Sequence, residues 1–119
     1  MARVLLAEDD AAMLDLVRRA LVQDGHSVVV AHDGQEALDL LGASGATFDV
    51  MLTDIHMPSV DGIELAGTAM SMLPKLKIIL MSADTDVNIP AQLKPHIAKV
   101  LAKPLALDQV RAAVRAAVG

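Results

Sequence analysis

The sequence predicts one α/β domain built as a doubly wound parallel sheet. Short runs rich in Val, Ile and Leu recur along the 119 residues, and apolar stripes with helical spacing lie between them. The runs mostly lack polar alternation, which is typical of strands buried on both faces. Strands that alternate with helices favour a parallel sheet with right-handed crossovers. We therefore expect five strands and five helices in a single domain over residues 1–119, without a separate output domain.

The strands and helices can be placed from these patterns. The predicted strands are Arg3–Ala7, Ser27–Ala31, Val50–Thr53, Lys77–Met81 and Ala98–Ala102. Apolar positions three and four residues apart predict the helices that follow. These stripes consist of Met13, Leu16, Val17, Ala20 and Leu21; Ala37, Leu38 and Leu41; Ile63, Ala66 and Met70; and Leu107, Val110, Val114 and Val118.

Capping motifs and prolines in the sequence also predict where helices begin and end. Asp33 and Asp61 each open the pattern Asp-Gly-x-Glu, in which Asp caps the helix and Glu three residues later can reach back to it. A fourth helix is expected within Thr85–Pro95, but Pro90 and Pro95 would each kink or stop it. We expect a short or irregular, mobile helix there.

Composition excludes several functions. Net charge is -5 and the ten Lys and Arg form no basic run, which argues against nucleic-acid binding. No apolar stretch approaches the ~20 residues that span a bilayer, and the N-terminus leads directly into a strand, so we expect a cytoplasmic protein without a membrane partner. The absence of cysteine excludes disulfides and thiol chemistry.

Charged residues follow the predicted strands. Glu8 and Asp9 come after the first strand, Asp54 after the third and Lys103 after the fifth, and the hydroxyl of Ser82 follows the fourth. In the flavodoxin-like strand order 2-1-3-4-5 the first and third strands are neighbours, so Asp54 would face Glu8 and Asp9 across the crevice. Carboxylates at such an edge suit Mg²⁺ and phosphate.

Each of these residues also has a simpler interpretation. An acidic residue before a helix complements the helix dipole, and Asp10 fits an N-cap of the helix starting at Ala11. A lone Asp54 could form a turn, and Lys103 could be a solvated charge. Pro104 fixes the turn beside Lys103, and a cis bond there would hold the ammonium in one direction.

As a set, the motifs resemble those of the receiver domains of two-component response regulators, which have the CheY-like fold, over the whole chain. The matching motifs are Ala7-Glu8-Asp9-Asp10, Thr53-Asp54-Ile55-His56-Met57-Pro58 with Asp61-Gly62, Met81-Ser82-Ala83, and Lys103-Pro104. The resemblance implies that Asp54 is the phospho-acceptor, that Ser82 is the switch hydroxyl and that Lys103 pairs with the phosphoryl group. It assigns Mg²⁺ to Glu8, Asp9, Asp54 and the backbone carbonyl of His56.

The resemblance also implies partners and an activity. A histidine kinase or histidine phosphotransfer protein would supply the phosphoryl group, and a downstream protein would bind in response. The chain would not be an enzyme beyond its own phosphorylation and slow autodephosphorylation. Two rival interpretations are an aspartyl phosphatase, which often has a second Asp where this chain has His56, and a pseudo-receiver that binds partners without being phosphorylated.

Two finer points concern output. Many receivers have an aromatic residue three positions before the lysine, whereas this chain has Val100, so output is expected through the loop after Ser82 and through Thr85–Pro95. A finer resemblance is to CpdR-like single-domain receivers, which act as adaptors to an AAA+ protease. It rests on the run ending in Leu5-Leu6-Ala7-Glu8-Asp9-Asp10, on Leu52-Thr53-Asp54-Ile55, on Asp61-Gly62-Ile63-Glu64-Leu65-Ala66 and on Ala98-Lys99-Val100-Leu101-Ala102-Lys103-Pro104.

Overall fold

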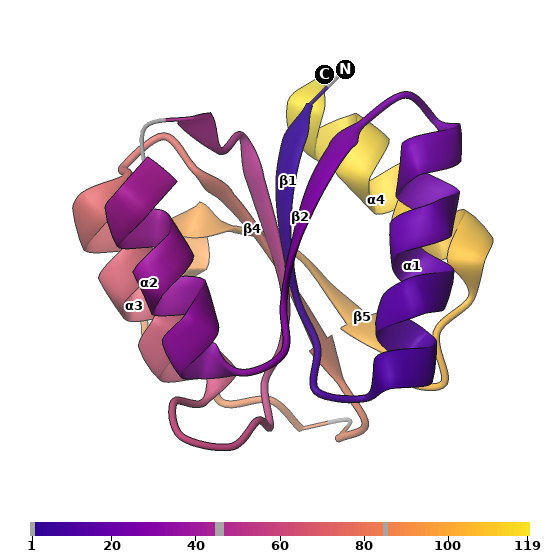
Figure 1. Ribbon diagram of the computed structural model, residues 1–119. Helices are drawn as coiled ribbons and strands as arrows, with labels where there is room; N and C mark the ends of the chain where they lie inside the picture. The colour runs from indigo at the N-terminus through magenta and orange to yellow at the C-terminus, as the bar shows by residue number, and fades with distance from the viewer. Residues whose placement is uncertain (1, 45–46, 85) are drawn as a thin grey trace.

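The structure, a computed structural model, describes residues 2–44, 47–84 and 86–119. Five parallel strands form one sheet in the order β2-β1-β3-β4-β5 (Figure 1). The strands are β1 (Arg3–Ala7), β2 (Ser27–Ala31), β3 (Val50–Asp54), β4 (Lys77–Ser82) and β5 (Ile97–Ala102). The predicted strands and their order are therefore confirmed. β3 and β4 end one residue later than expected, and β5 begins one residue earlier.

Helices cover both faces of the sheet. Within the described residues the α-helices are α1 (Ala11–Gln23), α2 (Gly34–Ser44), α3 (Gly62–Met72) and α4 (Leu107–Val118). Figure 1 shows α2 and α3 on one face and α1 and α4 on the other. The two faces form two separate apolar clusters, one beneath each helix pair. The sheet is consequently the middle layer of three.

The prediction of five helices is wrong, because the described part of the segment after β4 contains no α-helix. Residues 86–93 have irregular structure and turns, and a short 3-10 helix, η2 (Lys94–His96), precedes β5. Pro90 and Pro95 lack the N–H that a helix needs, which accounts for the loss. Val87, Ile89 and Leu93 pack against the core without a helix. Position 85 lies outside the described residues, and the mobility of this segment stays a prediction.

Burial on both faces explains why the strands lack polar alternation. In β1, Val4 and Leu6 pack beneath α1 and α4, whereas Leu5 and Ala7 pack beneath α2 and α3. All four side chains are fully buried. Because neighbouring residues point to opposite faces, a strand between two helical layers needs apolar residues at every position.

The predicted helix caps are present. The Asp10 carboxylate accepts the N–H groups of Ala12 and Met13 at 3.0 and 3.2 Å. The carboxylates of Asp33 and Asp61 each accept the N–H group three residues later at 2.8 Å. Each cap satisfies donors at a helix start and fixes where α1, α2 and α3 leave the carboxyl edge of the sheet.

Gly62 lies where α3 begins against the end of β3. Its N–H donates to the Ile55 carbonyl at 2.7 Å, and a Cβ atom on Gly62 would overlap the carbonyl oxygen of Asp54. A Cβ on Gly34 would similarly overlap the backbone of Val60. Since backbone atoms cannot yield without moving a strand or a helix, these positions require glycine.

We predict that Gly62→Ala lowers the free energy of unfolding by about 3 kcal/mol, because the new methyl group displaces the backbone at Asp54. Urea unfolding followed by circular dichroism measures the change. Gly67→Ala is the matched control in the same helix, since nothing lies within 4 Å of a Cβ there. This control should raise stability by about 0.5–1 kcal/mol. Equal stabilities of the two variants would contradict the proposed overlap.

Candidate phosphorylation and cation site

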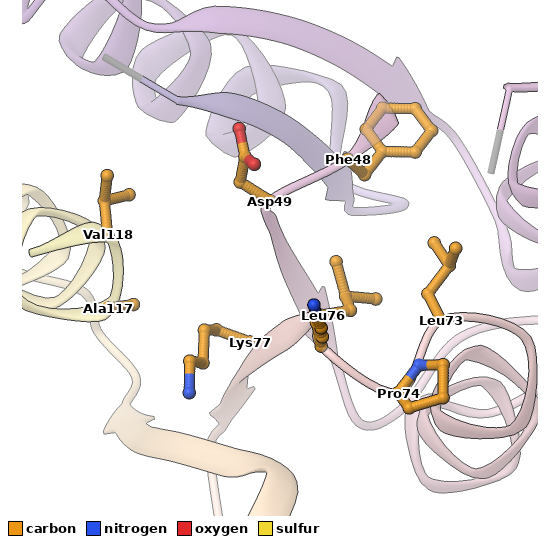
Figure 2. A pocket seen from close by; sticks show the side chains of 9 residues that line it. Phe48, Asp49, Leu73, Pro74, Leu76, Lys77, Ala117 and Val118 are labelled. Atoms are coloured by element: carbon orange, nitrogen blue, oxygen red, sulfur yellow. The ribbon is translucent and has the colours of Figure 1, made fainter. Parts of the chain in front are cut away.

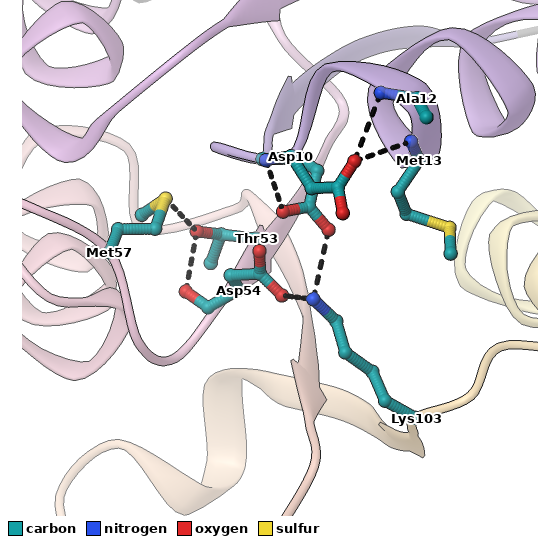
Figure 3. A network of polar contacts seen from close by, with 8 residues as sticks. Asp10, Ala12, Met13, Thr53, Asp54, Met57 and Lys103 are labelled. Atoms are coloured by element: carbon teal, nitrogen blue, oxygen red, sulfur yellow. Dashed lines mark hydrogen bonds and ion pairs between the residues drawn. The ribbon is translucent and has the colours of Figure 1, made fainter.

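The carboxyl ends of three strands bring two carboxylates and one ammonium together. Glu8 follows β1, Asp54 ends β3 and Lys103 follows β5. The ammonium of Lys103 lies between the two acids, with Nζ 3.0 Å from Glu8 Oε1 and 2.5 Å from Asp54 Oδ1. Figure 3 shows its contact with Asp54. The Lys103–Pro104 peptide bond is cis.

The two acids are buried but differ in their hydrogen bonds. Glu8 is 1% exposed and Asp54 is 2% exposed. Glu8 accepts the N–H of Asp10 at 3.1 Å as well as the Lys103 ammonium. Asp54 has only Lys103 on Oδ1, and its buried Oδ2 accepts no hydrogen bond from the described residues. One carboxylate oxygen of Asp54 is thus left available for a ligand.

This difference determines where the cluster keeps a proton. Burial, together with the neighbouring Glu8, raises the pKa of Asp54 to about 8 against the opposing effect of Lys103. Burial also acts to raise the pKa of Glu8, but the adjacent Asp54 carboxyl, the Asp10 N–H and the Lys103 ammonium together outweigh it and lower that pKa. Burial acts to lower the pKa of Lys103, yet its two carboxylate partners raise it. Lys103 therefore stays charged, and Asp54 is the group that gains a proton.

The residues present fit a divalent cation. Glu8, Asp9 and Asp54 each offer an oxygen, and these three atoms lie within 4.8 Å of one another. Asp9 is exposed, so the cluster opens to solvent on one side. Carboxylate oxygens with room for water are what Mg²⁺ prefers, and the three carboxylates carry more negative charge than the single Lys103 ammonium offsets.

Ser82 and His56 lie at the same edge but contact Asp84. Ser82 is buried at the end of β4, and its hydroxyl oxygen accepts the Asp84 N–H at 3.0 Å. The exposed His56 side chain pairs with the Asp84 carboxylate at 2.9 Å. Ser82 forms no hydrogen bond with Asp54 or with the Lys103 side chain among the contacts described for this part of the chain.

Sequence reasoning missed two residues of this site. Asp84 connects the loop after β3 with the loop after β4, and its only sequence signal is an acidic residue two positions after Ser82. Thr53 is fully buried, and its hydroxyl donates to the Asp54 carbonyl at 3.0 Å (Figure 3). Neither contact follows from residue spacing, because both depend on how the loops turn.

An acidic trio at the switch point of a flavodoxin-like sheet, joined by a lysine from the last strand, defines the class of protein. The chain belongs to the response regulator receiver domain family, whose pattern it matches over residues 4–115. This family acts as a phosphorylation switch in two-component signalling.

Curated relatives agree with this assignment. The chain is 36% identical over 115 residues to the response regulator MprA of Mycobacterium avium strain 104, which covers 96% of this chain and 50% of the relative. The corresponding protein of Mycobacterium tuberculosis strain H37Rv is 35% identical, with 96% and 49% covered. The chain thus spans about half the length of the curated relatives it matches.

Solved structures support the CheY-like fold. The receiver domain of Francisella response regulator 1452 has a TM-score of 0.87 at 28% identity, covering 99% of this chain and 97% of that one. CheY4 of Vibrio cholerae has a TM-score of 0.82 at 28% identity, with 98% of each chain covered. TrrA of Thermotoga maritima, solved with Mg²⁺ and BeF, has a TM-score of 0.85 at 25% identity, covering 98% and 99%.

None of the helices in the described ranges is both long enough and apolar enough to pass through a membrane.

We predict that the wild-type chain loses stability as pH rises from about 5 to 8 in the presence of a chelator. The Asp54 carboxyl ionises near pH 3.9 when unfolded but at about 8 when folded, so the folded state binds the extra proton in this window. The lowered pKa of Glu8 acts below this window and the raised pKa of Lys103 acts above it. Urea unfolding at several pH values should show a loss on the order of a few kcal/mol.

Asp54→Asn should remove most of this slope and make the protein more stable than wild type at pH 8. Asp39→Asn, which neutralises an exposed carboxylate on α2, should keep the wild-type slope. Parallel stability curves for wild type and Asp54→Asn would show that Asp54 does not hold the proton.

Proposed function

We propose that this chain accepts a phosphoryl group on Asp54 from the histidine of a kinase or phosphotransfer protein. The observation that carries the proposal is the buried Asp54 carboxylate, whose Oδ1 is held by Lys103 while Oδ2 has no partner. That oxygen would attack phosphorus as the bond from phosphorus to the donor histidine nitrogen breaks, and the electron pair would leave with the imidazole.

Lys103 and the acidic trio would prepare Asp54 for this reaction. The nucleophile must be ionised, and the raised pKa of Asp54 opposes ionisation. The Lys103 ammonium favours the ionised form and orients the carboxylate through Oδ1. Mg²⁺ held by Glu8, Asp9, Asp54 and the His56 carbonyl would neutralise the charge that builds up during transfer. TrrA, which shares the fold, was solved with Mg²⁺.

Phosphorylation would change the balance of charge around Ser82. The phosphoryl group adds up to about one further negative charge to the cluster, which attracts Lys103 and the Ser82 hydroxyl. Ser82 Oγ accepts the Asp84 N–H, so a move toward Asp54 would break this bond and release the loop. Reversing a 1:99 equilibrium takes about 5.5 kcal/mol, which several charge-assisted hydrogen bonds can supply and one neutral bond cannot.

The output surface would lie beside β5. Val100 is 37% exposed where many receivers carry an aromatic residue, and it shares a hollow of about 430 Å³ with Asp84, Val87 and Ile89. Movement of the loop after Ser82 would therefore change the shape of this hollow. In many receivers an aromatic side chain at this position swings inward. In this chain, a shift of residues 86–93 would take the place of that movement.

Two kinds of downstream output are compatible with the chain. The CpdR-like sequence motifs suggest binding to an AAA+ protease. The similarity to MprA fits equally well with output through a further protein segment. A cytoplasmic location and slow autodephosphorylation complete the proposal. They follow from the two-component role and not from a contact.

Phosphorylation can be tested with acetyl phosphate and Mg²⁺, using intact-mass spectrometry. Wild type should gain one phosphoryl group, and the gain should disappear with chelator or with Asp54→Ala. The Lys103→Gln variant should be phosphorylated at least about tenfold more slowly than wild type, because Asp54 loses the charge that orients it. Modification of Asp54→Ala at the wild-type rate would contradict the assignment of the acceptor.

The same samples separate the rival functions. Turnover of acetyl phosphate in large excess over protein, at a rate unaffected by accumulated phosphoprotein, would favour an aspartyl phosphatase. Absence of any phosphoprotein with both acetyl phosphate and a cognate histidine donor would favour a pseudo-receiver.

Cation binding gives an independent prediction, measured by isothermal titration calorimetry with MgCl₂. Asp9→Asn should weaken Mg²⁺ binding by about tenfold, because it removes one of three anionic ligands. Asp10→Asn is the matched control: asparagine caps α1 as well as aspartate does, and Asp10 lies outside the trio. Equal weakening in both variants would indicate a general charge effect instead of a built site.

A further inference from the structure

A second hollow lies at the opposite edge of the sheet from Asp54, where strands β3 and β4 begin. Its volume is about 640 Å³, within the range of ~300–1,000 Å³ that is usual for small-molecule sites. It lies between the residues before β3, the connection from α3 to β4 and the end of α4 (Figure 2). Its apolar lining consists of Phe48, Leu73, Pro74, Leu76, Ala117 and Val118.

The charges beside this apolar surface are mainly positive. Lys75 and Lys77 line the hollow, and neither forms an ion pair with any residue in the described ranges. Figure 2 shows the Lys77 side chain extending along the hollow between β4 and the end of α4. A third cation, the guanidinium of Arg3, lies 5.2 Å from the centre of the Phe48 ring.

One carboxylate opposes these cations but is already engaged. Asp49 lines the hollow, and its Oδ2 accepts the Arg3 N–H at 2.8 Å. With two lysines and one aspartate in the lining, the local charge is positive although the chain as a whole carries -5. An apolar cavity with unpaired ammonium groups at its border is complementary to a molecule with an apolar body and one anionic group.

We propose that this hollow binds a small organic anion with an aliphatic or aromatic body, such as a medium-chain carboxylate. The apolar part would lie against the more accessible Leu73, Pro74 and Val118, beside the largely buried Phe48 and Leu76 that also line the hollow. The carboxylate would lie near Lys75 and Lys77. This site is separate from the phosphorylation site and does not depend on it, because the two lie at opposite ends of the strands.

Phe48 provides a direct reporter, because it is the only aromatic residue of the chain among Phe, Trp and Tyr. Octanoate, below its micellar concentration, is titrated into the full chain labelled with ¹³C-phenylalanine, and the ring resonances are followed by NMR. A saturable shift is expected. The neutral analogue 1-octanol should bind about three- to tenfold more weakly, and octyltrimethylammonium more weakly still.

Variants test whether the lysines provide this preference. Lys75→Gln with Lys77→Gln should weaken octanoate binding about three- to tenfold and leave octanol binding unchanged. Arg18→Gln with Arg19→Gln is the matched control: it removes the same charge from α1, where both arginines pair with Asp15 away from the hollow. This control should bind octanoate like wild type.

Several results would overturn the proposal. These are unchanged NMR resonances of the Phe48 ring, equal affinity for the three amphiphiles, and equal weakening of octanoate binding in both double variants. Sedimentation velocity of the same samples tests whether a second copy of the chain fills the hollow. A dimer that octanoate dissociates would assign the hollow to self-association and not to a small anion.

Discussion

The contact of one ammonium with two buried carboxylates is the interaction on which the site depends. Lys103 bridges Glu8 and Asp54, which are almost completely buried, so without it two anions would be desolvated without compensation. One ammonium cannot neutralise both: burial and the neighbouring Glu8 raise the pKa of Asp54, and the negative charge that Lys103 leaves unbalanced is the reason to expect affinity for a cation. In the proposed function, the same imbalance would make the cluster sensitive to an added phosphoryl group.

The parallel sheet makes this contact possible. Its three central strands, β1, β3 and β4, are buried on both faces along most of their length, so polar side chains gather where these strands end. The order β2-β1-β3-β4-β5 places the ends of β1 and β3 side by side. Gly62 then lets α3 begin directly against the backbone of Asp54, which limits movement of Asp54. Packing and chemistry thus constrain the same few residues.

The two ends of the strands differ in charge and in the ligands that they fit. The carboxyl ends carry Glu8, Asp9 and Asp54, and the hollow at the amino ends carries Lys75 and Lys77. At one edge of the sheet, Val100 of β5 shares a hollow with Val87 and Ile89 of the irregular segment. In the proposed mechanism, a change in charge at the carboxyl edge would reach this surface through the Asp84 contacts without a complete helix in this segment.

The sequence by itself determined the five strands, the caps at Asp10, Asp33 and Asp61 and the set of charged residues at strand ends, because burial on both faces and capping leave local signals. Tertiary structure decided the rest. Glu8 and Lys103 are 95 positions apart, and no local pattern shows that Lys103 is shared with Asp54 or that one Asp54 oxygen stays free. The absent helix, the close approach at Gly62 and the hollow beside Phe48 likewise depend on how separate segments pack. Residue spacing along the chain indicates which face of a helix or strand a side chain lies on. Contacts between distant segments form only when the layers pack together.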